Sequence, residues 1–289
     1  MIHYSELNDN IPLQQHHMKL YAKKSLGQHF LNSKHVLEQI IAAAEIKKSE
    51  KILEIGPGTG TLTEALLETG ANVVAIEKDH RAIDLLRIKF EVASGSGQLR
   101  VIEGDILDTE LLERKSFHHS IFQSFNSPYS VVANIPYYIT GAILEKFLAH
   151  EPRPDRMILL VQKEVAERIV EINNGKESIL SISVKAFGTP RIITKVPRGA
   201  FTPAPTVDSA ILAITNISND RFVENNIDIS RFFEIVRAGF AHKRKFLMRN
   251  LEEVVGRDKV VIVWQKLKLD PQVRAEDISV DQWFLIAGM

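Results

Sequence analysis

Short apolar runs alternate with segments of helical periodicity through much of the chain. The runs predict buried strands at Lys51–Ile55, Asn72–Ile76, Leu99–Ile102, Ser130–Ala133 and Met157–Val161. Before the first run, apolar residues from Val36 to Ala44 recur at helical spacing, and Ser33 is a suitable N-cap for the helix that they predict. Strands that alternate with helices in this way are typical of a mostly parallel sheet covered on both faces.

The pattern changes after the fifth predicted strand. Arg191–Val196 and Ser209–Thr215 are apolar runs separated by a proline-rich turn, which predicts an antiparallel pair at one edge of the sheet. Later helices are predicted at Ser230–Ala241, Lys243–Val255 and Ser279–Ala287. The chain is therefore predicted to contain a flexible extension at 1–20, an α/β domain at 21–216 and a small helical domain at 217–289.

Composition narrows the class of protein. The chain has 289 residues, 45% hydrophobic and 25% charged, and no run approaches the roughly 18 apolar residues of a membrane span. The N-terminus lacks the basic start and apolar core of a secretory signal, and the absence of cysteine excludes disulfides and thiolate ligands. No metal is predicted, because His16-His17 and His118-His119 have no third ligand at metal-site spacing. We expect a cytoplasmic monomer.

Three predicted strand ends carry residues that suit one nucleoside ligand. The first leads into the loop Gly56–Gly60, whose glycines let the backbone turn sharply and approach a ligand closely. The second ends near Glu77, a carboxylate that can accept from both ribose hydroxyls, and the third precedes Asp105 and the apolar Ile106, which suit an adenine ring. The G-x-G-x-G spacing differs from that of dinucleotide sites. S-adenosylmethionine (SAM) is therefore the predicted cofactor.

The tetrapeptide after the fourth predicted strand, Asn134-Ile135-Pro136-Tyr137, suits methylation of an adenine amino group. The lone pair of that nitrogen is delocalised, so catalysis needs acceptors that hold the amino hydrogens and aim the lone pair at the methyl group. The Asn134 side-chain oxygen and the Ile135 carbonyl can be these acceptors. Pro136 fixes the turn without offering an N–H, and Tyr137 offers a ring for an extruded base.

Further motifs accompany these strand ends. Gly27–Leu31 reads GQHFL, Phe201–Ala210 reads FTPAPTVDSA and Arg274–Ser279 reads RAEDIS. Together with EIGPGTG, Glu77, Asp105 and NIPY, they resemble the motifs of the ribosomal RNA adenine N6,N6-dimethyltransferase family of the KsgA type. The resemblance runs from about Lys23 to the end of the chain.

The resemblance implies a Rossmann-like SAM-dependent methyltransferase fold with a seven-stranded sheet. It also implies dimethylation of two adjacent adenines near the 3′ end of small-subunit rRNA, in a pre-ribosomal particle during ribosome biogenesis, with S-adenosylhomocysteine as product. By motif, the cofactor should contact His29, Leu31, Gly56, Gly58, Glu77, Asp105, Ile106 and Asn134. Phe201 is implied as a second aromatic wall for the target base. The family often has asparagine in place of His29, and we expect this difference to alter local detail only.

Basic residues cluster although the chain has 36 basic and 36 acidic residues and no formal net charge. The segment from Arg237 to Arg249 contains five of them and no acidic residue, and Lys243, Arg244, Lys245 and Arg249 are the predicted RNA contacts. A second acid-free stretch contains Lys19, Lys23, Lys24 and Lys34. An ordinary solvated helix face is the alternative interpretation of either stretch taken alone.

Two alternative functions remain open from the sequence. Related resistance methyltransferases modify large-subunit rRNA with the same N-x-P-[YF] chemistry, but they generally lack motifs like FTPAPTVDSA and RAEDIS. A ribosome-assembly or transcription factor could keep the fold and bind nucleic acid without turnover. The intact tetrapeptide at Asn134 and the acid at Glu77 favour an enzyme.

Overall fold

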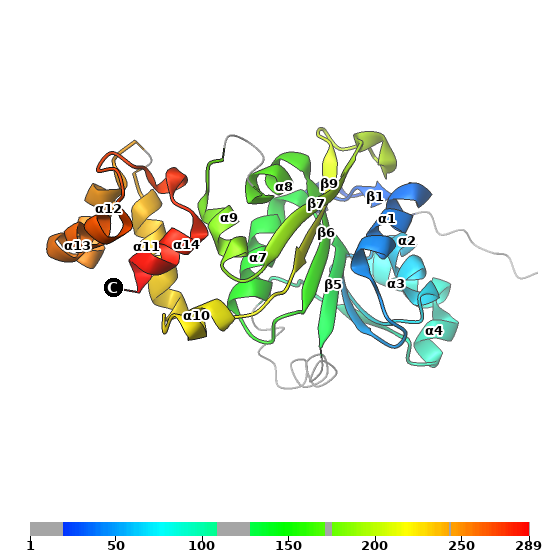
Figure 1. Ribbon diagram of the computed structural model, residues 1–289. Helices are drawn as coiled ribbons and strands as arrows, with labels where there is room; N and C mark the ends of the chain where they lie inside the picture. Colours follow the sequence, from blue (N-terminus) through cyan, green and yellow to red (C-terminus); the bar gives the residue numbers. More distant parts are fainter. Residues whose placement is uncertain (1–19, 109–127, 171–174, 243, 289) are drawn as a thin grey trace, which may run out of the picture.

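A seven-stranded sheet forms the centre of the computed structural model, which describes residues 20–108, 128–170, 175–242 and 244–288 (Figure 1). The strand order is β4-β3-β2-β5-β6-β9-β7. The strands are β2 (Lys51–Ile55), β3 (Asn72–Glu77), β4 (Leu99–Glu103), β5 (Tyr129–Asn134), β6 (Arg156–Gln162), β7 (Thr189–Val196) and β9 (Ser209–Thr215). Strands β2 to β6 pair in parallel, and β9 runs antiparallel to both β6 and β7. The predicted α/β fold with an antiparallel pair at one edge is confirmed.

Neighbouring residues of each strand face opposite layers of helices, because side chains alternate across a sheet. Leu53 packs in one hydrophobic layer with α7 (Thr140–Ala149), α8 (Lys163–Val170) and α9 (Ile179–Lys185). Ile52 packs in the other layer with α1 (Lys34–Ala44), α2 (Thr61–Glu68) and α3 (His80–Lys89), which α4 (Glu91–Gly95) follows. The two layers lie on opposite sides of the sheet in Figure 1. Ser33 caps α1 as predicted, since its hydroxyl accepts from Val36 N–H.

A second, two-stranded sheet joins distant parts of the chain. Strand β1 (Phe30–Leu31) pairs antiparallel with β8 (Phe201–Thr202), which follows the short 3-10 helix η3 (Arg198–Ala200). The side chain of Asn32 extends the junction by donating to the Thr202 hydroxyl at 2.6 Å. Residues 23–32, which include the 3-10 helix η1 (Lys24–Leu26), are called the N-terminal segment below. The pairing holds this segment beside the carboxyl ends of the main strands.

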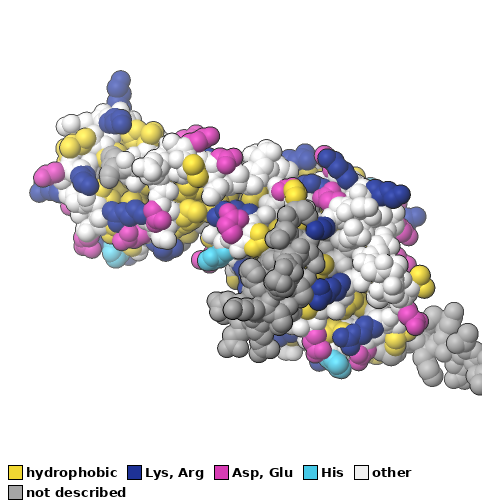
Figure 2. Space-filling view, turned by 90° about the horizontal axis from the view of Figure 1, so that it is seen from below, with side chains coloured by type: hydrophobic (Ala, Val, Ile, Leu, Met, Phe, Trp, Pro, Cys, Tyr) yellow, Lys and Arg dark blue, Asp and Glu magenta, His cyan; other side chains and the backbone are white. Residues whose placement is uncertain are grey.

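The region after β9 is helical, as predicted. It contains α10 (Asp220–Glu224), α11 (Ile229–Phe240), α12 (Leu247–Val255), α13 (Arg257–Leu267), the 3-10 helix η4 (Ala275–Asp277) and α14 (Val280–Ala287). Aromatic side chains connect it to the sheet region, since the Phe187 ring lies 4.9 Å from that of Phe222 and 6.0 Å from that of Phe233. In Figure 2 the helical region forms a separate lobe, and side chains of both charges are interspersed over the face in view. The division at 1–20, 21–216 and 217–289 stays a prediction, and residues 1–19 lie outside the described residues.

One helix prediction in this region needs correction, and helix α13 was missed. The helix predicted at Lys243–Val255 begins only at Leu247, because the chain turns after α11 with Lys245 N–H donating to the His242 carbonyl. The Leu247 N–H then donates to the carbonyl of Val273. Helix α13 was not predicted, since its five consecutive apolar residues, Val260 to Trp264, conceal the helical period. The helices predicted on either side of these two are confirmed as α11 and α14.

Candidate functional site

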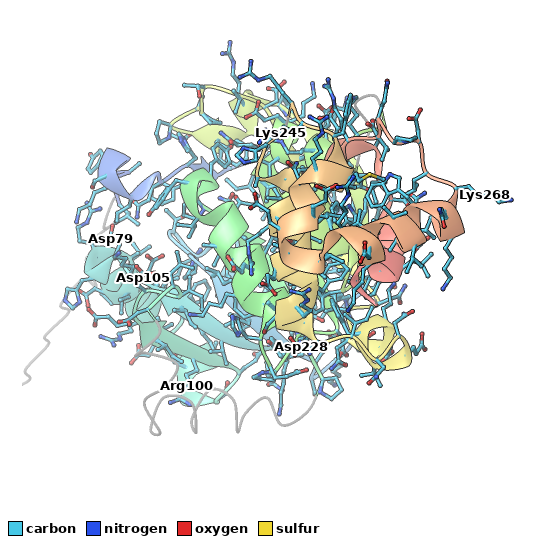
Figure 3. All side chains as sticks on the ribbon, turned by 90° about the vertical axis from the view of Figure 1, so that its left-hand side faces the viewer. Asp79, Arg100, Asp105, Asp228, Lys245 and Lys268 are labelled. Carbon is cyan, nitrogen blue, oxygen red and sulfur yellow. The ribbon has the colours of Figure 1, made fainter. Side chains whose placement is uncertain are left out.

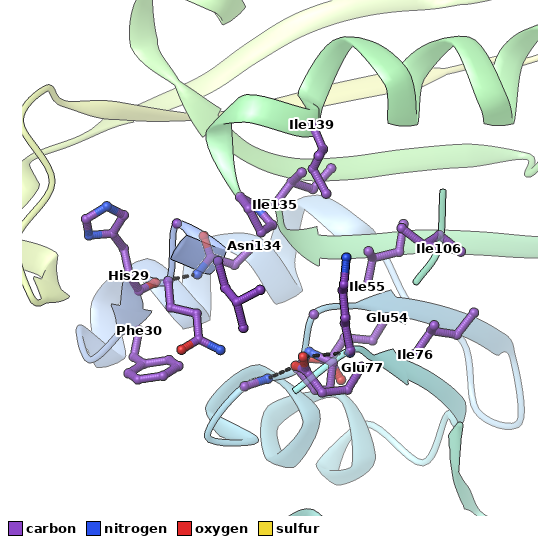
Figure 4. A pocket seen from close by; sticks show the side chains of 18 of the residues that line it. His29, Phe30, Glu54, Ile55, Ile76, Glu77, Ile106, Asn134, Ile135 and Ile139 are labelled. Carbon is purple, nitrogen blue, oxygen red and sulfur yellow. Dashed lines mark hydrogen bonds between the residues drawn. The ribbon is translucent and has the colours of Figure 1, made fainter. Parts of the chain in front are cut away.

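The predicted cofactor contacts and the tetrapeptide Asn134–Tyr137 line one cavity of about 180 Å³ at the carboxyl ends of β2, β3, β4 and β5 (Figure 4). Its walls come from the N-terminal segment, the glycine loop after β2 and the turns that follow the other three strands. The predicted cofactor contacts in this lining are His29, Leu31, Gly56, Gly58, Glu77, Asp105, Ile106 and Asn134. Ile135, Pro136 and Tyr137 line it as well. The topology thus brings the separate motifs together, and the role of each residue stays a prediction.

Glu77 connects the glycine loop to the turn after β3. Its carboxylate accepts from the backbone N–H groups of Gly58 at 3.0 Å, Lys78 at 2.8 Å and Asp79 at 2.8 Å. Burial raises the pKa of Glu77, and these hydrogen bonds oppose the rise. A carboxylate has about four acceptor positions, so Glu77 keeps capacity for a ligand hydroxyl. Gly56 has φ of 67°, and a Cβ built there meets nothing within 4 Å, which leaves room for a ligand beside the loop.

Asp105 is held at the end of β4 by two donors. The Leu107 N–H lies 2.9 Å from its carboxylate, and the Lys78 ammonium lies 2.7 Å away. Burial acts to raise the pKa of Asp105, but the hydrogen bonds from Lys78 and Leu107 outweigh it and lower the pKa. Ile106 is buried next to this carboxylate and presents an apolar surface. Lys78 was not among the predicted residues, and its place directly after Glu77 gave the only signal for it.

Asn134 ends β5 with a side chain of fixed orientation. Its amide nitrogen donates to the backbone carbonyl of His29 at 3.0 Å (Figure 4). Among the described residues, no protein donor bonds the Asn134 side-chain oxygen or the Ile135 carbonyl. Both oxygens therefore remain available to accept hydrogen bonds from a ligand in the cavity. The backbone of His29 contributes to this arrangement more directly than its ring does.

The ring of His29 turns away from Glu77, as Figure 4 shows. Its Nδ1 lies 2.8 Å from the Pro203 carbonyl, and the ring stacks on Tyr137 with centroids 5.7 Å apart and planes 21° apart. A carbonyl only accepts, so Nδ1 carries the hydrogen in this contact. The Tyr137 hydroxyl lies 2.6 Å from the Ser209 hydroxyl, and burial raises the pKa of Tyr137.

Phe201 does not take the position expected of an aromatic wall. It is 3% exposed, packs in the hydrophobic layer that contains Leu31, and is not among the residues that line the cavity. The pairing of β8 with β1 accounts for this placement, because Phe201 lies opposite Leu31 in the register. The structure therefore gives no support to a direct contact between Phe201 and a base.

Two further residues reach the cavity without having been predicted. Glu54 is 1% exposed and accepts from the Thr63 hydroxyl at 2.7 Å, and burial raises its pKa to about 8. Phe30 covers the glycine loop, since a Cβ on Gly58 would lie 3.0 Å from its ring. Both belong to motifs already noted, Glu54 to EIGPGTG and Phe30 to GQHFL. These motifs marked the two positions, but they did not predict the contacts that the Glu54 and Phe30 side chains make.

The N-terminal segment is also fastened to the turn after β3. Gln28 donates to Asp79 at 3.0 Å, and the Lys23 ammonium lies 3.7 Å from the same carboxylate. Asp79 caps α3 through the Arg81 N–H, and hydrogen bonding from the Arg81 side chain is the main reason that the pKa of Asp79 falls to about 2. Gln28 therefore connects the segment to the turn next to Glu77.

The predicted RNA contacts that the structure describes belong to the helical region and do not line the cavity. Arg244, Lys245 and Arg249 are exposed, and Lys243 lies outside the described residues. In Figure 3, Arg100 near the start of β4 is at the bottom, Asp105 past its end is higher, and Lys245 is near the top. Lys245 is therefore on the side of the molecule toward which the parallel strands point.

Metal-ligating clusters and membrane-spanning helices are both missing from the part of the chain that the structure describes. In those ranges, no three His, Cys, Asp or Glu side chains come close enough together to hold a metal ion. No helix in the same ranges has the length and apolar character that crossing a membrane requires.

Comparison with known protein families shows which family this chain belongs to. The model of the family described as ribosomal RNA adenine dimethylase matches residues 19–289. The chain belongs to this family. The predicted resemblance is therefore confirmed, and the match includes the helical region as well as the sheet.

Named relatives agree with membership of the ribosomal RNA adenine dimethylase family. A ribosomal RNA small subunit methyltransferase A from Dehalococcoides mccartyi is 41% identical over 91% of this chain and 87% of its own length. One from Nostoc sp. is 38% identical over 92% of this chain and 97% of its own. A dimethyladenosine transferase structure from Plasmodium falciparum has a TM-score of 0.71 and 27% identity, covering 89% of this chain and 96% of that one. The 23S rRNA methyltransferase ErmE, at 24% identity and a TM-score of 0.67 over 89% of this chain and 98% of its own, shares the fold.

Proposed function

We propose that this protein transfers methyl groups from SAM to the N6 nitrogen of adenines in small-subunit ribosomal RNA, two to each base. Family membership and relatives named ribosomal RNA small subunit methyltransferase A support the reaction class and the RNA. The observation that carries the chemistry is the orientation of Asn134, whose amide nitrogen bonds the His29 carbonyl. The side-chain oxygen is thereby left to accept from a substrate amino group.

The cavity fits SAM on the chemistry of its lining. Glu77 is a buried carboxylate with acceptor capacity for ribose hydroxyls, and Asp105 beside Ile106 offers a charged acceptor next to an apolar surface for the adenine. Gly56 leaves open space where the cofactor can approach the backbone. When bound, SAM supplies a methyl group on a positively charged sulfur.

The residues of the tetrapeptide would act on the RNA base. In the first transfer, the oxygens of Asn134 and Ile135 would hold the two amino hydrogens of the target adenine, so the nitrogen becomes more tetrahedral and its lone pair points at the methyl group. In the second transfer, one hydrogen is left on the nitrogen, and one of the two oxygens would hold it. As the new N–C bond forms, the S–C bond breaks, and the surplus proton leaves the nitrogen for solvent. Tyr137 holds the extruded base by stacking, on the ring face that His29 does not cover.

The finer parts of the proposal concern the substrate in the cell. We infer that the target is a pair of adjacent adenines near the 3′ end of the RNA, modified in a pre-ribosomal particle in the cytoplasm by a monomer of this protein. Two methyl groups per base require that the product S-adenosylhomocysteine is exchanged for SAM between transfers. The N-terminal segment, which crosses the cavity, must permit this exchange.

Large-subunit RNA is the weaker alternative. The likeness to ErmE concerns the fold alone at 24% identity, whereas the curated relatives at about 40% identity are named for the small subunit.

A ribosome-assembly factor without enzymatic turnover is the second alternative. Such a factor would not need a tetrapeptide in which the Asn134 oxygen is left to accept from a substrate. Neither alternative has an observation of its own in favour.

The direct test is incubation of the protein with labelled SAM and small subunits that lack the modification. Nucleoside analysis by mass spectrometry should then find N6,N6-dimethyladenosine, and large subunits serve as the matched substrate control. Label in large subunits alone, or label on another atom of adenine, would contradict the proposal.

A further inference from the structure

Tyr138 is an exposed aromatic residue at the edge of the cavity. It is 66% exposed, and it lines the cavity together with Asn134 and Tyr137. Single exposed hydrophobic residues are common on protein surfaces. Among the described residues, however, Tyr138 is the one exposed large hydrophobic residue that also lines the cavity. Tyr138 is therefore placed where a ligand of Asn134 and Tyr137 can contact it.

The ring of Tyr138 is supported by the N-terminal segment. A Cβ built on Gly27 would lie 3.1 Å from Cε1 and 3.2 Å from Cδ1 of Tyr138, so the ring lies against the Gly27 backbone. Lys78 lines the same cavity, and its hydrogen bond to Asp105 is the main reason that its pKa is raised. The Lys78 side chain is itself 56% exposed. The Tyr138 ring thus lies against the backbone of the N-terminal segment and is otherwise largely in solvent.

The two consecutive tyrosines face different surroundings. Both lie in the 3-10 helix η2 (Tyr137–Ile139), where three residues per turn separate neighbouring side chains by about 120°. Tyr137 points inward, half-buried, with its hydroxyl on Ser209. Tyr138 points outward, with its ring largely in solvent. Adjacent aromatic side chains with this division suit adjacent nucleotides, one inside the cavity and one at its edge.

We propose that Tyr138 is the stacking platform for the nucleotide next to the adenine that is being methylated. The inference rests on the proposed function, in which the substrate contains two adjacent adenines. Extruding one adenine leaves its neighbour without a stacking partner on one face, and an exposed ring is the side chain that restores this contact. Tyr138 is therefore a substrate-binding residue, which selects for a base beside the target.

The rival occupant of this ring is the cofactor. Tyr138 lines the same cavity as Asp105, the predicted adenine acceptor, so the ring could instead close over bound SAM. A ring that covers SAM would affect its affinity, and a ring that stacks an RNA base would affect the affinity for RNA. The two occupants are therefore distinguished by separate binding measurements.

The experiment compares Tyr138→Ala, Tyr138→Phe and the wild type, with Tyr21→Ala as matched control. Tyr21 is 68% exposed and does not line the cavity. Methylation rates are measured against the concentration of unmethylated small subunits at saturating SAM, and SAM affinity is measured by calorimetry. We expect Tyr138→Ala to raise the KM for small subunits on the order of tenfold, because one base–aromatic stack is removed. The kcat and the Kd for SAM should stay within about twofold.

The conservative variant makes the result specific to the ring. Tyr138→Phe should retain the wild-type KM, because stacking needs the ring and not the hydroxyl. A rise in the Kd for SAM that matches the rise in KM would overturn the proposal in favour of a cofactor cover. An unchanged KM in Tyr138→Ala, or a Phe variant as impaired as the Ala variant, would overturn it as well.

A binding measurement separates this inference from the proposed function. An oligoribonucleotide with an adenine and an adjacent 2-aminopurine is titrated with protein saturated with S-adenosylhomocysteine. The 2-aminopurine takes the place of the base next to the target adenine. Stacking on Tyr138 should quench the fluorescence with the wild type and the Phe variant but not with the Ala variant. Absence of dimethyladenosine formation by the wild type would refute the proposed function, and equal quenching by the Ala variant and the wild type would refute the platform.

Discussion

Asn134 bonds the protein through one end of its amide and leaves the other end to the cavity. The donor to His29 fixes the rotation of the amide, so its oxygen needs no rearrangement before it accepts from a substrate. A pre-set acceptor of this kind lowers the barrier of the chemical step and contributes little to the affinity for SAM. The orientation depends on the N-terminal segment, which is far from Asn134 in the sequence.

Replacing Asn134 should therefore separate chemistry from binding. We expect Asn134→Ala to lower kcat by about a hundredfold to a thousandfold, because one acceptor for the amino hydrogens is removed. The Kd for SAM, measured by calorimetry, should change by no more than about threefold. Asn72→Ala is the matched control, since the Asn72 amide donates to the Ser49 carbonyl at the start of β3 and does not line the cavity. Equal losses of kcat and SAM affinity would mean that Asn134 mainly supports the fold.

Glu54 should make the stability of the protein depend on pH. Its pKa is raised from 4.5 to about 8 because it is buried, so between these values the folded protein holds a proton that the unfolded chain releases. Stability contributed by this protonated group is thus lost as the pH rises through that window. The Glu54→Gln variant lacks the effect and still offers an oxygen to Thr63. The free energy of unfolding of Glu54→Gln, relative to that of the wild type, should increase by up to about 1.4 kcal/mol per pH unit from pH 5 to pH 8.

Urea denaturation at several pH values measures this difference. Glu64→Gln is the control, because Glu64 pairs with Lys89 at the surface and not in the core. Parallel stability curves for the wild type and Glu54→Gln would show that Glu54 is ionised in the folded protein at neutral pH. The carboxylate of Asp79, with its pKa of about 2, changes the free energy of unfolding only at acidic pH, below the range in which Glu54 acts.

The loop between β2 and α2 contains glycines with different physical requirements. Gly60, with φ of 76°, precedes α2, and a Cβ there would lie 2.6 Å from the Phe90 ring and 2.8 Å from Leu86. Gly56 also has a positive φ, but its missing side chain faces open space. Gly60 is therefore required for packing between the loop and α3, and Gly56 leaves room for a ligand.

Alanine should mainly reduce stability at Gly60 and mainly weaken SAM binding at Gly56. Gly60→Ala should cost about 2–4 kcal/mol of stability through backbone strain and overpacking against Phe90. Gly56→Ala should cost only about 1–2 kcal/mol but weaken SAM binding by at least about tenfold, or 1.4 kcal/mol. Denaturation and calorimetry on both variants measure the two quantities. Similar effects of the two substitutions on SAM affinity would contradict this division.

Elements with a strong local pattern could be predicted from the sequence, and elements that depend on distant pairing could not. The five parallel strands and the edge pair were predicted because each is a bounded apolar run. Strands β1 and β8 contain two residues each, and neither has a period to detect. This pairing decides where Phe201 lies, so the expected contact between its ring and a base could not be corrected before the structure was known.

Helix α13 illustrates a second limit. Val261 and Ile262 are 38% and 61% exposed although they stand in the middle of an apolar run. Periodicity identifies a helix only when its outer face is polar, and here that face carries β-branched residues. In the site, the motifs gave the residue positions, but the contacts of Glu54, Lys78 and Tyr138 depend on which strand ends become neighbours. Three-dimensional structure was needed for these.

At the scale of the whole molecule, the cavity and the predicted RNA contacts lie in two different regions. The cavity lies at the carboxyl ends of the parallel strands, and Lys245 lies on that same side in the helical region (Figure 3). The face seen from below in Figure 2 carries both charges interspersed. The aromatic contacts of Phe187 with Phe222 and Phe233 join the two regions. An RNA that enters the cavity can therefore extend toward the basic residues without crossing to the opposite face.

The basic residues should act on RNA affinity alone. We expect the combined variant Arg244→Glu, Lys245→Glu and Arg249→Glu to raise the KM for small subunits and to leave the Kd for SAM unchanged, because these exposed side chains do not line the cavity. The dependence of log affinity on log salt should become shallower by about one unit for each phosphate that the variant no longer binds. Glutamates at Lys259, Lys266 and Lys268, which are exposed on α13 and just after it, provide a control of equal charge change. An equal rise in KM in both variants would indicate a general effect of net charge, whereas a rise confined to the first would identify the α11–α12 turn as an RNA-binding element.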